Sequence, residues 1–581
     1  MTSSSFARAL CACATAALLV HPVMAQDSMA QEGSGAIEAI PAAFEADALS
    51  PEAMAFEVAL ASQTEGFSED ERAAIGGFYE SRDFQPYWTA GSAAPLAALR
   101  AAIGTASAQG LPANRYDLSA LEATDGAPEG AAAVPLELAA MRAYLQWGGD
   151  LTGGIVRPLS VDDEINVRPE RATAGDLLGR LADGSASDVL SGLEPQDPDY
   201  AALMAERKRL TAMAQDGGLG PRVPTGPSLH VGESSPRVVA LRDRLAKLGY
   251  ASETEGDART ALVETAGAPD AAPAFDATAF DPRLEAELKA FQRDQGLNDD
   301  GVAGPRTLAA LNVSVADRIR MIDVNLERMR WFNRDLGNRR IEVNIPDYSV
   351  EMIENGAVVW SSRTVVGEVE ETRTPEFSDE MTHMVVNPTW HIPDSIATRV
   401  YLPKLRSDPD VLRRNGMSLF TRSGMEINPS LVDFSQYSAE TFPFRVKQNP
   451  SSANALGRVK FMFPNQFAIY LHDTPARQYF ARDARALSNG CIRLEKPLEL
   501  AYVLLDGQVS NPEARFDGWL ASKSETYVNL DDPVQVHLMY RTVFVDETGK
   551  IRYREDIYGR DAKVFAALQA RGVQLPDGVQ G

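Results

Sequence analysis

Cys491 stands in the run LSNGCIRL at residues 487–494, where a glycine and small polar residues precede it. His472 lies upstream, at the end of the strand-like run FAIYLH at residues 467–472. A thiolate is a strong nucleophile, and an imidazole within reach can take the proton of the thiol. The pair therefore predicts nucleophilic catalysis by a cysteine and a histidine. The alternative interpretation is a small buried thiol near a hydrogen-bonded strand histidine.

The residues beside Cys491 supply candidate hydrogen-bond donors. Gly490 permits tight backbone geometry, so the amides of residues 490–491 can form an oxyanion hole. Ser488, Asn489 and Arg493 can add donors, although Arg493 fits a structural salt bridge equally well. Further away, Trp390 fits either a substrate groove or a buried core.

Metal and cofactor chemistry have no support in the sequence. The histidines are scattered, and His383 and His391 have no nucleophile nearby, so we expect these two in the fold or a pocket wall. No zinc-ligand spacing, phosphate loop or G-x-S-x-G motif is present. We expect no metal and no cofactor.

The charge balance excludes one class of partner. The chain has 81 acidic and 56 basic residues, a formal net charge of −25, whereas nucleic-acid binding needs concentrated positive charge. Between residues 472 and 496 the balance reverses, and basic side chains outnumber acidic ones. This positive segment fits either an anionic ligand or a solvated face.

Residues 1–25 have the pattern of a secretory signal peptide. Arg8 precedes an apolar run at 9–20, and small residues around Ala25 fit a cleavage site. Cys11 and Cys13 fall inside this segment, and the apolar run continues past Cys13, which argues against lipidation. We therefore expect an exported chain with no transmembrane segment and one cysteine, Cys491, whose survival in an oxidising compartment favours a task for it.

At 581 residues the chain is too long for one core, and the expected fold class is multi-domain α+β. Ser68 and Glu71 form a capping-box pattern that opens a helical region, and Asn355 with Gly356 predicts a β-hairpin. The predicted divisions are a disordered acidic tail at 26–66, a helical domain at 67–215, a linker at 216–229, a three-helix module at 230–312 with a surface insertion at 251–280, a linking helix at 313–337, a β-rich domain at 338–507 with a lid at about 394–450, and a C-terminal extension at 508–581.

Several motifs resemble one known family. The runs YLHDTP at 470–475 and RALSNGCIRL at 485–494 resemble the L,D-transpeptidase catalytic domain, and VKFMFPN at 459–465 and NPTW at 387–390 are similar to its large, multi-domain periplasmic branch. The run GLNDDGVAGPRTL at 296–308 resembles a three-helix peptidoglycan-binding domain. The runs FQPYW at 84–88 and GLP at 110–112 resemble the helical scaffold domain of that branch. Asn489 occupies a position where the family more often has His, Ser or Arg.

The resemblance implies a reaction and a site. Cys491 would attack the carbonyl between the third and fourth residues of a peptidoglycan tetrapeptide stem, release D-alanine and hold the stem as a thioester. His472 would activate the thiol, with the carbonyl of Asp473 orienting the imidazole, and Tyr470 and Trp390 would belong to the substrate site. A second stem would then resolve the thioester through its amine and form a 3-3 cross-link.

The resemblance also implies a periplasmic enzyme of cell-wall biogenesis and cell shape, acylated by carbapenems, with peptidoglycan synthases as possible partners. Two other acceptors stay open: water, which makes an L,D-carboxypeptidase, and the amine of an envelope protein being attached to the wall. A non-catalytic peptidoglycan-binding scaffold is the alternative from another class.

Overall fold

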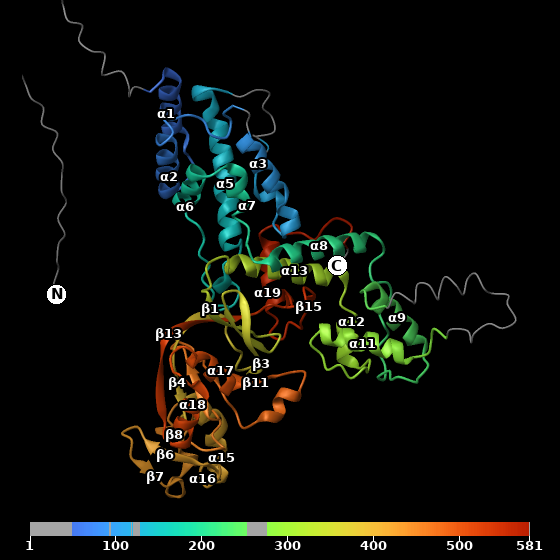
Figure 1. Ribbon diagram of the computed structural model, residues 1–581, viewed down its shortest axis with the longest axis vertical. Helices are drawn as coiled ribbons and strands as arrows, with labels where there is room; N and C mark the ends of the chain where they lie inside the picture. Colours follow the sequence, from blue (N-terminus) through green and yellow to red (C-terminus); the bar gives the residue numbers. More distant parts are fainter. Residues whose placement is uncertain (1–48, 92–93, 118, 120–127, 252–275, 580–581) are drawn as a thin grey trace, which may run out of the picture. The chain divides into compact units, whose positions relative to one another are not determined.

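The computed structural model describes residues 49–91, 94–117, 119, 128–251 and 276–579. From Pro51 onward the chain forms one compact unit. Its N-terminal part is helical and its C-terminal part is rich in strands, which confirms the predicted α+β class (Figure 1). The predicted signal peptide and most of the insertion predicted at 251–280 lie outside the described residues.

The tail predicted at 26–66 is wrong in its last part, because helix α1 (Pro51–Gln63) occupies it. Ala53, Phe56 and Leu60 recur at helical spacing, and Phe56 is fully buried. The chain here is poor in large apolar residues, but Phe56 and Leu60, with Ala53 on the same face, suffice to dock the helix onto a neighbouring core. Order therefore begins before the capping box at Ser68, which is present as predicted.

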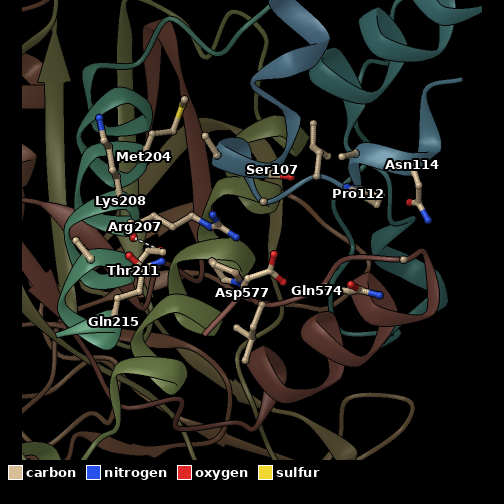
Figure 2. Close-up of a pocket in the computed structure, with 18 of the residues that line it drawn as sticks. Ser107, Pro112, Asn114, Met204, Arg207, Lys208, Thr211, Gln215, Gln574 and Asp577 are labelled. Atoms are coloured by element: carbon tan, nitrogen blue, oxygen red, sulfur yellow. Dashed lines mark hydrogen bonds between the residues drawn. The ribbon is translucent and has the colours of Figure 1, made fainter. Parts of the chain in front are cut away.

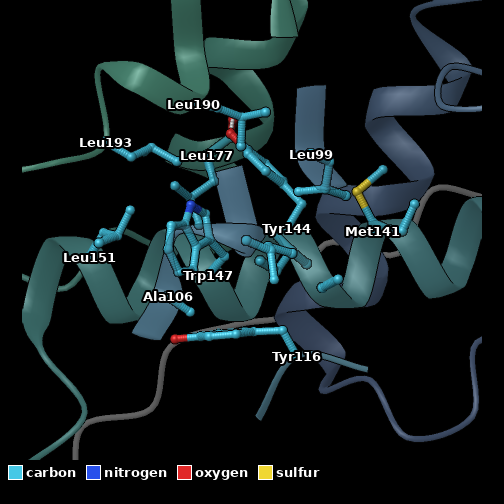
Figure 3. Packing of buried hydrophobic residues seen from close by; sticks show 14 of the residues in the cluster. Leu99, Ala106, Tyr116, Met141, Tyr144, Trp147, Leu151, Leu177, Leu190 and Leu193 are labelled. Atoms are coloured by element: carbon cyan, nitrogen blue, oxygen red, sulfur yellow. Dashed lines mark hydrogen bonds between the residues drawn. The ribbon is translucent and has the colours of Figure 1, made fainter. Parts of the chain in front are cut away.

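The helical domain packs around the buried helix α5 (Val134–Gly153). Trp147 of α5 is fully buried and meets the ring of Tyr116 edge to face at 5.1 Å (Figure 3). The other helical segments of this domain are α2 (Glu69–Glu80), α3 (Ala94–Gly104), η1 (Ala106–Gln109), η2 (Ala113–Arg115), η3 (Gly130–Ala133), η4 (Pro158–Ser160), α6 (Ala174–Asp183) and α7 (Ala186–Ser191). The helix α8 (Pro198–Gln215) that follows them packs on α13 (Val315–Trp331).

The carboxylate of Glu137, on α5, is fully buried and organises the start of this domain. It accepts hydrogen bonds from the hydroxyl of Tyr79 at 2.6 Å and of Thr89 at 2.8 Å. The backbone amides of Tyr87, Trp88 and Thr89 also donate to it. One side chain thus fixes the loop after α2 to α5.

The three-helix module consists of α9 (Pro236–Lys247), α11 (Pro282–Asp294) and α12 (Pro305–Leu311). Each helix opens on a proline, and Ser235 and Asp281 cap the first two through their side chains. Leu241, Leu288 and Leu308 are among the residues of its small apolar core.

The predicted linking helix is α13 (Val315–Trp331), and it is buried along much of its length. Its charged residues take partners from other elements. Asp323 accepts from Arg207 of α8 at 2.5 Å, and Glu327 accepts from the amide of Val156 at 2.7 Å. Arg328 donates to Asp561 near the C-terminus at 2.5 Å.

The β-rich domain is built on a nine-stranded sheet in the order β11-β3-β12-β10-β9-β4-β13-β1-β2. The pairing of β2 with β3 closes the sheet on itself, and the hairpin between them is the predicted one, with φ of 51° at Asn355 and 81° at Gly356. The strands are β1 (Arg339–Asn344), β2 (Ser349–Glu354), β3 (Ala357–Gly367), β4 (Phe377–Val386), β9 (Val459–Met462), β10 (Leu471–His472), β11 (Ala486–Ser488), β12 (Ile492–Leu494) and β13 (Thr526–Met539).

The segment predicted as a C-terminal extension at 508–581 is partly integral to this sheet. β13 lies between β4 and β1 (Figure 1). Its alternate apolar residues, such as Val534, Val536 and Leu538, are buried in the core of the sheet. Helices α17 (Pro497–Leu505) and α18 (Pro512–Ala521) precede it. After it, β14 (Val543–Val545), β15 (Ile551–Tyr553) and α19 (Arg560–Ala570) follow, and α19 packs on α13.

The region predicted as a lid at about 394–450 folds as a small subdomain with its own apolar core. Its four-stranded sheet has the order β5-β8-β6-β7, formed by β5 (Trp390–Ile392), β8 (Phe444–Gln448), β6 (Met417–Thr421) and β7 (Glu426–Ile427). Its helical segments are α14 (Asp394–Ile396), the π-helical turn η5 (Ala397–Tyr401), α15 (Leu402–Ser407), α16 (Val411–Arg414), η6 (Pro429–Leu431) and η7 (Phe434–Gln436).

Glu137→Ala should lower the free energy of unfolding by at least about 3 kcal/mol, because it leaves buried donors without an acceptor. Urea denaturation followed by tryptophan fluorescence measures this change. Glu57→Ala, at an exposed position of α1, is the control and should change stability by less than about 0.5 kcal/mol. Equal effects of the two substitutions would contradict the role given to Glu137.

Candidate active site

Two adjacent strands bring the predicted nucleophile and base together. β10 and β12 pair in parallel, with Leu471 opposite Ile492 and His472 opposite Arg493. Cys491 directly precedes β12, so residues separated in sequence by a loop and the short strand β11 become neighbours. Cys491 and His472 both line a cavity of about 470 Å³, together with Trp390, Tyr470 and Arg493.

His472 is held in one orientation. Its ring is 5% exposed, and Nδ1 lies 2.5 Å from the carbonyl oxygen of Asp473, the partner that the sequence predicted. Because a carbonyl only accepts, Nδ1 carries the hydrogen and Nε2 is left with a free lone pair. Burial, and then the nearby charge of Arg493, lower the pKa of His472 to about 3, so the imidazole is neutral at neutral pH.

Cys491 is half-buried, and its thiol donates to the carbonyl oxygen of Ala468 at 3.6 Å. Burial raises the pKa of this thiol to about 11, against the opposing effects of the amide and hydroxyl of Tyr470 and the charges of Arg493 and Lys460. Within the described residues no hydrogen bond joins Sγ to the imidazole of His472. Thiol and imidazole are thus both neutral at rest, and the proton must move as the sulfur attacks.

The loop before Cys491 is stabilised by the side chain of one of its own residues, Ser488. The hydroxyl of Ser488 is buried, donates to the carbonyl oxygen of Cys491 at 2.5 Å and accepts from the amide of Gly490 at 3.1 Å. Gly490 has a φ of +104°, and a Cβ there would stand 3.1 Å from Ile469. Ser488 therefore shapes the loop instead of offering its donor to a ligand, and glycine is required at 490.

Asn489 is exposed and is contacted by the subdomain that was predicted as a lid. Its side-chain oxygen accepts from Arg399 of η5 at 2.5 Å, and Arg399 also pairs with Glu371. All three residues line the cavity. The sequence analysis missed Arg399 and Glu371, because folding brings them to the loop of Cys491 from two other segments: η5, and the loop between β3 and β4.

Two of the predicted polar residues have different surroundings. The carboxylate of Asp473 points into the protein, where it accepts from the amides of Arg458 and Thr474 and from the side chain of Arg477, all at 2.8–2.9 Å. Asp473 therefore serves the site through its carbonyl alone. Arg493 lines the cavity, and its buried Nε has no hydrogen-bond partner among the described residues. Its guanidinium is thus available to an anionic ligand.

Other candidate positions lack this chemistry. A cavity of about 900 Å³ lies between α8, the segment 107–114 and the C-terminal residues 572–577, but its lining includes neither cysteine nor histidine (Figure 2). Its Arg207 is already paired with Asp323. His383 and His391 lie outside the lining of the Cys491 cavity. Over the described ranges, no group of three or more potential ligands could hold a metal ion.

Three stretches of the chain match known families of domains. Residues 338–513 match the L,D-transpeptidase catalytic domain, 73–206 a scaffold domain and 234–311 a putative peptidoglycan-binding domain. By this match residues 338–513, which hold Cys491 and His472, are similar to an L,D-transpeptidase catalytic domain. A putative L,D-transpeptidase from Haemophilus influenzae is 37% identical over 227 residues, which are 39% of this chain and 45% of that protein. The match thus spans less than half of that relative.

Two solved structures of L,D-transpeptidases are also similar. The one from Xylanimonas cellulosilytica is 16% identical, covers 54% of this chain and 99% of its own, and has a TM-score of 0.16. The one from Stackebrandtia nassauensis is 12% identical, covers 55% and 96%, and has a TM-score of 0.20. At these scores the superpositions add nothing to the assignment, which depends on the matches of the three domains.

The thiol of the L,D-transpeptidase domain should react slowly at neutral pH. Because its pKa is raised to about 11, alkylation of Cys491 by iodoacetamide should accelerate about tenfold per pH unit from pH 7 to 10. Tyr470→Phe removes a hydroxyl that stabilises the thiolate and should slow alkylation a few-fold at a given pH, while the exposed Tyr527→Phe should not. Mass spectrometry of the Cys491 peptide measures the rates, and a plateau below pH 8 would contradict the raised pKa.

Proposed function

We propose that this protein is an exported L,D-transpeptidase that forms 3-3 cross-links between peptidoglycan stems through a thioester on Cys491. The observation that carries the proposal is the shared cavity of Cys491 and His472, with Nδ1 of the imidazole occupied by Asp473 and Nε2 left free to accept a proton. A catalytic cysteine needs this arrangement of base and orienting acceptor.

In the first half-reaction Nε2 of His472 takes the thiol proton as Sγ of Cys491 attacks the carbonyl between the third and fourth residues of the donor stem. The carbonyl electrons move to oxygen, where backbone amides of the loop can stabilise the charge. When the intermediate collapses, the carbon–nitrogen bond breaks, the proton passes from His472 to the leaving amine, and D-alanine departs.

In the second half-reaction the side-chain amine of an acceptor stem attacks the thioester carbonyl. His472 takes a proton from this amine and returns it to the departing sulfur, so the free thiol is restored and an amide bond joins the stems. The neutral imidazole suits this role, because it must accept a proton at the start of each half-reaction.

Charge around the cavity is consistent with an anionic substrate. Arg399 and Arg493 line it, and the charge of Lys460 acts on the thiol. Stem peptides carry free carboxylates, which guanidinium groups bind in paired geometry. The peptidoglycan-binding domain would hold the enzyme on its polymer, and we propose the periplasm as its location. None of the described helices is both long and apolar enough to cross a membrane.

The raised pKa of Cys491 favours one competing function, a peptidoglycan-binding protein whose β-rich domain is silent. Among catalytic alternatives, water as acceptor gives an L,D-carboxypeptidase, and an envelope-protein amine gives attachment of that protein to the wall. The products formed from purified stems separate these possibilities.

Incubation with disaccharide-tetrapeptides should release D-alanine and give cross-linked dimers. Cys491→Ala should abolish both products, and His472→Gln should lower the rate by at least about 100-fold because it removes the proton acceptor. His383→Gln, outside the cavity, is the matched control and should retain activity. Carbapenem addition to the Cys491 peptide, seen by mass, is a second readout. D-alanine release that survives in Cys491→Ala would refute the proposal.

A further inference from the structure

The peptide group between Gly490 and Cys491 is held by a hydrogen bond from a segment distant in sequence. Thr374 is fully buried, and its hydroxyl donates to the carbonyl oxygen of Gly490 at 2.8 Å across 116 positions. The same oxygen of Thr374 accepts from the amide of Gly367 at 2.9 Å. Beside it, Thr372 donates to the carbonyl oxygen of Ser488 at 2.9 Å. The loop of Cys491 is thus fixed by groups outside its own motif.

This hydrogen bond also determines where the amide of Cys491 points. The described peptide bonds are trans, so the N–H of Cys491 lies antiparallel to the carbonyl of Gly490 in one plane. Cys491 lines the cavity and Thr374 does not. Because the carbonyl of Gly490 points toward Thr374, the amide of Cys491 points away from Thr374. The amide of Gly490 is occupied by Ser488, whereas that of Cys491 has no hydrogen-bond partner in the part of the chain that the structure describes.

Thr374 is itself held by the C-terminal segment. The hydroxyl of Tyr558 accepts from the amide of Thr374 at 3.2 Å and donates to the carbonyl oxygen of Gly367 at 2.7 Å. Arg560 donates to the carbonyl oxygen of Thr374 at 3.0 Å and pairs with the buried Glu376 at 3.0 Å. Backbone and side chain of Thr374 therefore have partners that leave it a single position.

We infer that Thr374 is a positioning residue that aims the amide of Cys491 at the oxygen of the attacked carbonyl, with Tyr558 holding Thr374 in place. The inference rests on acyl transfer at Cys491, the proposed function. As Sγ bonds to the carbonyl carbon, the π electrons move to oxygen, and the N–H of Cys491 donates to that oxygen until the leaving group departs. Thr374 exchanges no proton and touches no substrate.

The test compares reactions that do and do not form an oxyanion, using the full chain. Thr374→Val keeps the shape but loses the donor, and Thr374→Ser keeps the donor. Acetylation of Cys491 by p-nitrophenyl acetate passes through a tetrahedral oxyanion, whereas alkylation by iodoacetamide does not. Thr374→Val should slow acetylation and the kcat of D-alanine release by about 10- to 100-fold, with KM within about twofold. Alkylation should stay within about twofold, and Thr374→Ser should stay within about threefold of wild type in every assay.

Tyr558→Phe is the second variant, and it should reduce acetylation selectively by a smaller factor. The exposed Tyr527→Phe is its control and should change neither reaction. Thermal midpoints verify that each variant is folded. Acetylation within threefold of wild type in Thr374→Val would overturn the inference, as would a loss of alkylation in proportion to acetylation. If wild type releases no D-alanine but acetylation still depends on Thr374, the proposed substrate fails and the positioning role stands.

Discussion

The buried charges of α13 constrain the rest of the structure. Asp323, Glu327 and Arg330 have almost no exposure, and an unpaired charge at such a depth would be strongly destabilising. Asp323 pairs with Arg207 of α8, and Glu327 and Arg330 pair with each other at 2.8 Å. Glu327 also accepts from the amide of Val156, and Arg330 donates to the hydroxyl of Tyr200. The helix that joins the peptidoglycan-binding module to the catalytic domain therefore also fixes the scaffold domain and, through Arg328 and Asp561, the C-terminal segment.

Burial has a second effect at the candidate active site, where it keeps the thiol of Cys491 and the imidazole of His472 uncharged. It raises the pKa of the Cys491 thiol and lowers that of the His472 imidazole, and the nearby cations oppose only the first of these shifts. Under the proposed function this site starts without an ion pair, so acyl transfer would depend on stabilising charge as it develops on the substrate. The hydrogen bonds that hold the loop around Gly490 would then affect the rate of acyl transfer more than the pKa of the resting thiol does.

Patterns local in sequence were predictable, and contacts between distant segments were not. The hairpin at Asn355 depends on two adjacent residues with positive φ, and the capping box at Ser68 depends on residues three apart. The motifs likewise predicted that Cys491 and His472 would lie together and that the carbonyl of Asp473 would contact the imidazole, and both are found in the structure. Thr374 and Arg399 carry no local signal, since a lone threonine or arginine acquires a role only when folding brings it beside residues 489–490.

The position of β13 has a consequence for biosynthesis. This strand lies between β4 and β1, yet it comes late in the chain, at Thr526–Met539. While the polypeptide is being synthesised, β1 and β4 each have an unpaired edge until residues near 540 are made, and such edges invite aggregation. The nascent protein should therefore depend on chaperones that cover these edges, and the sheet that holds Cys491 is complete only when synthesis is almost over.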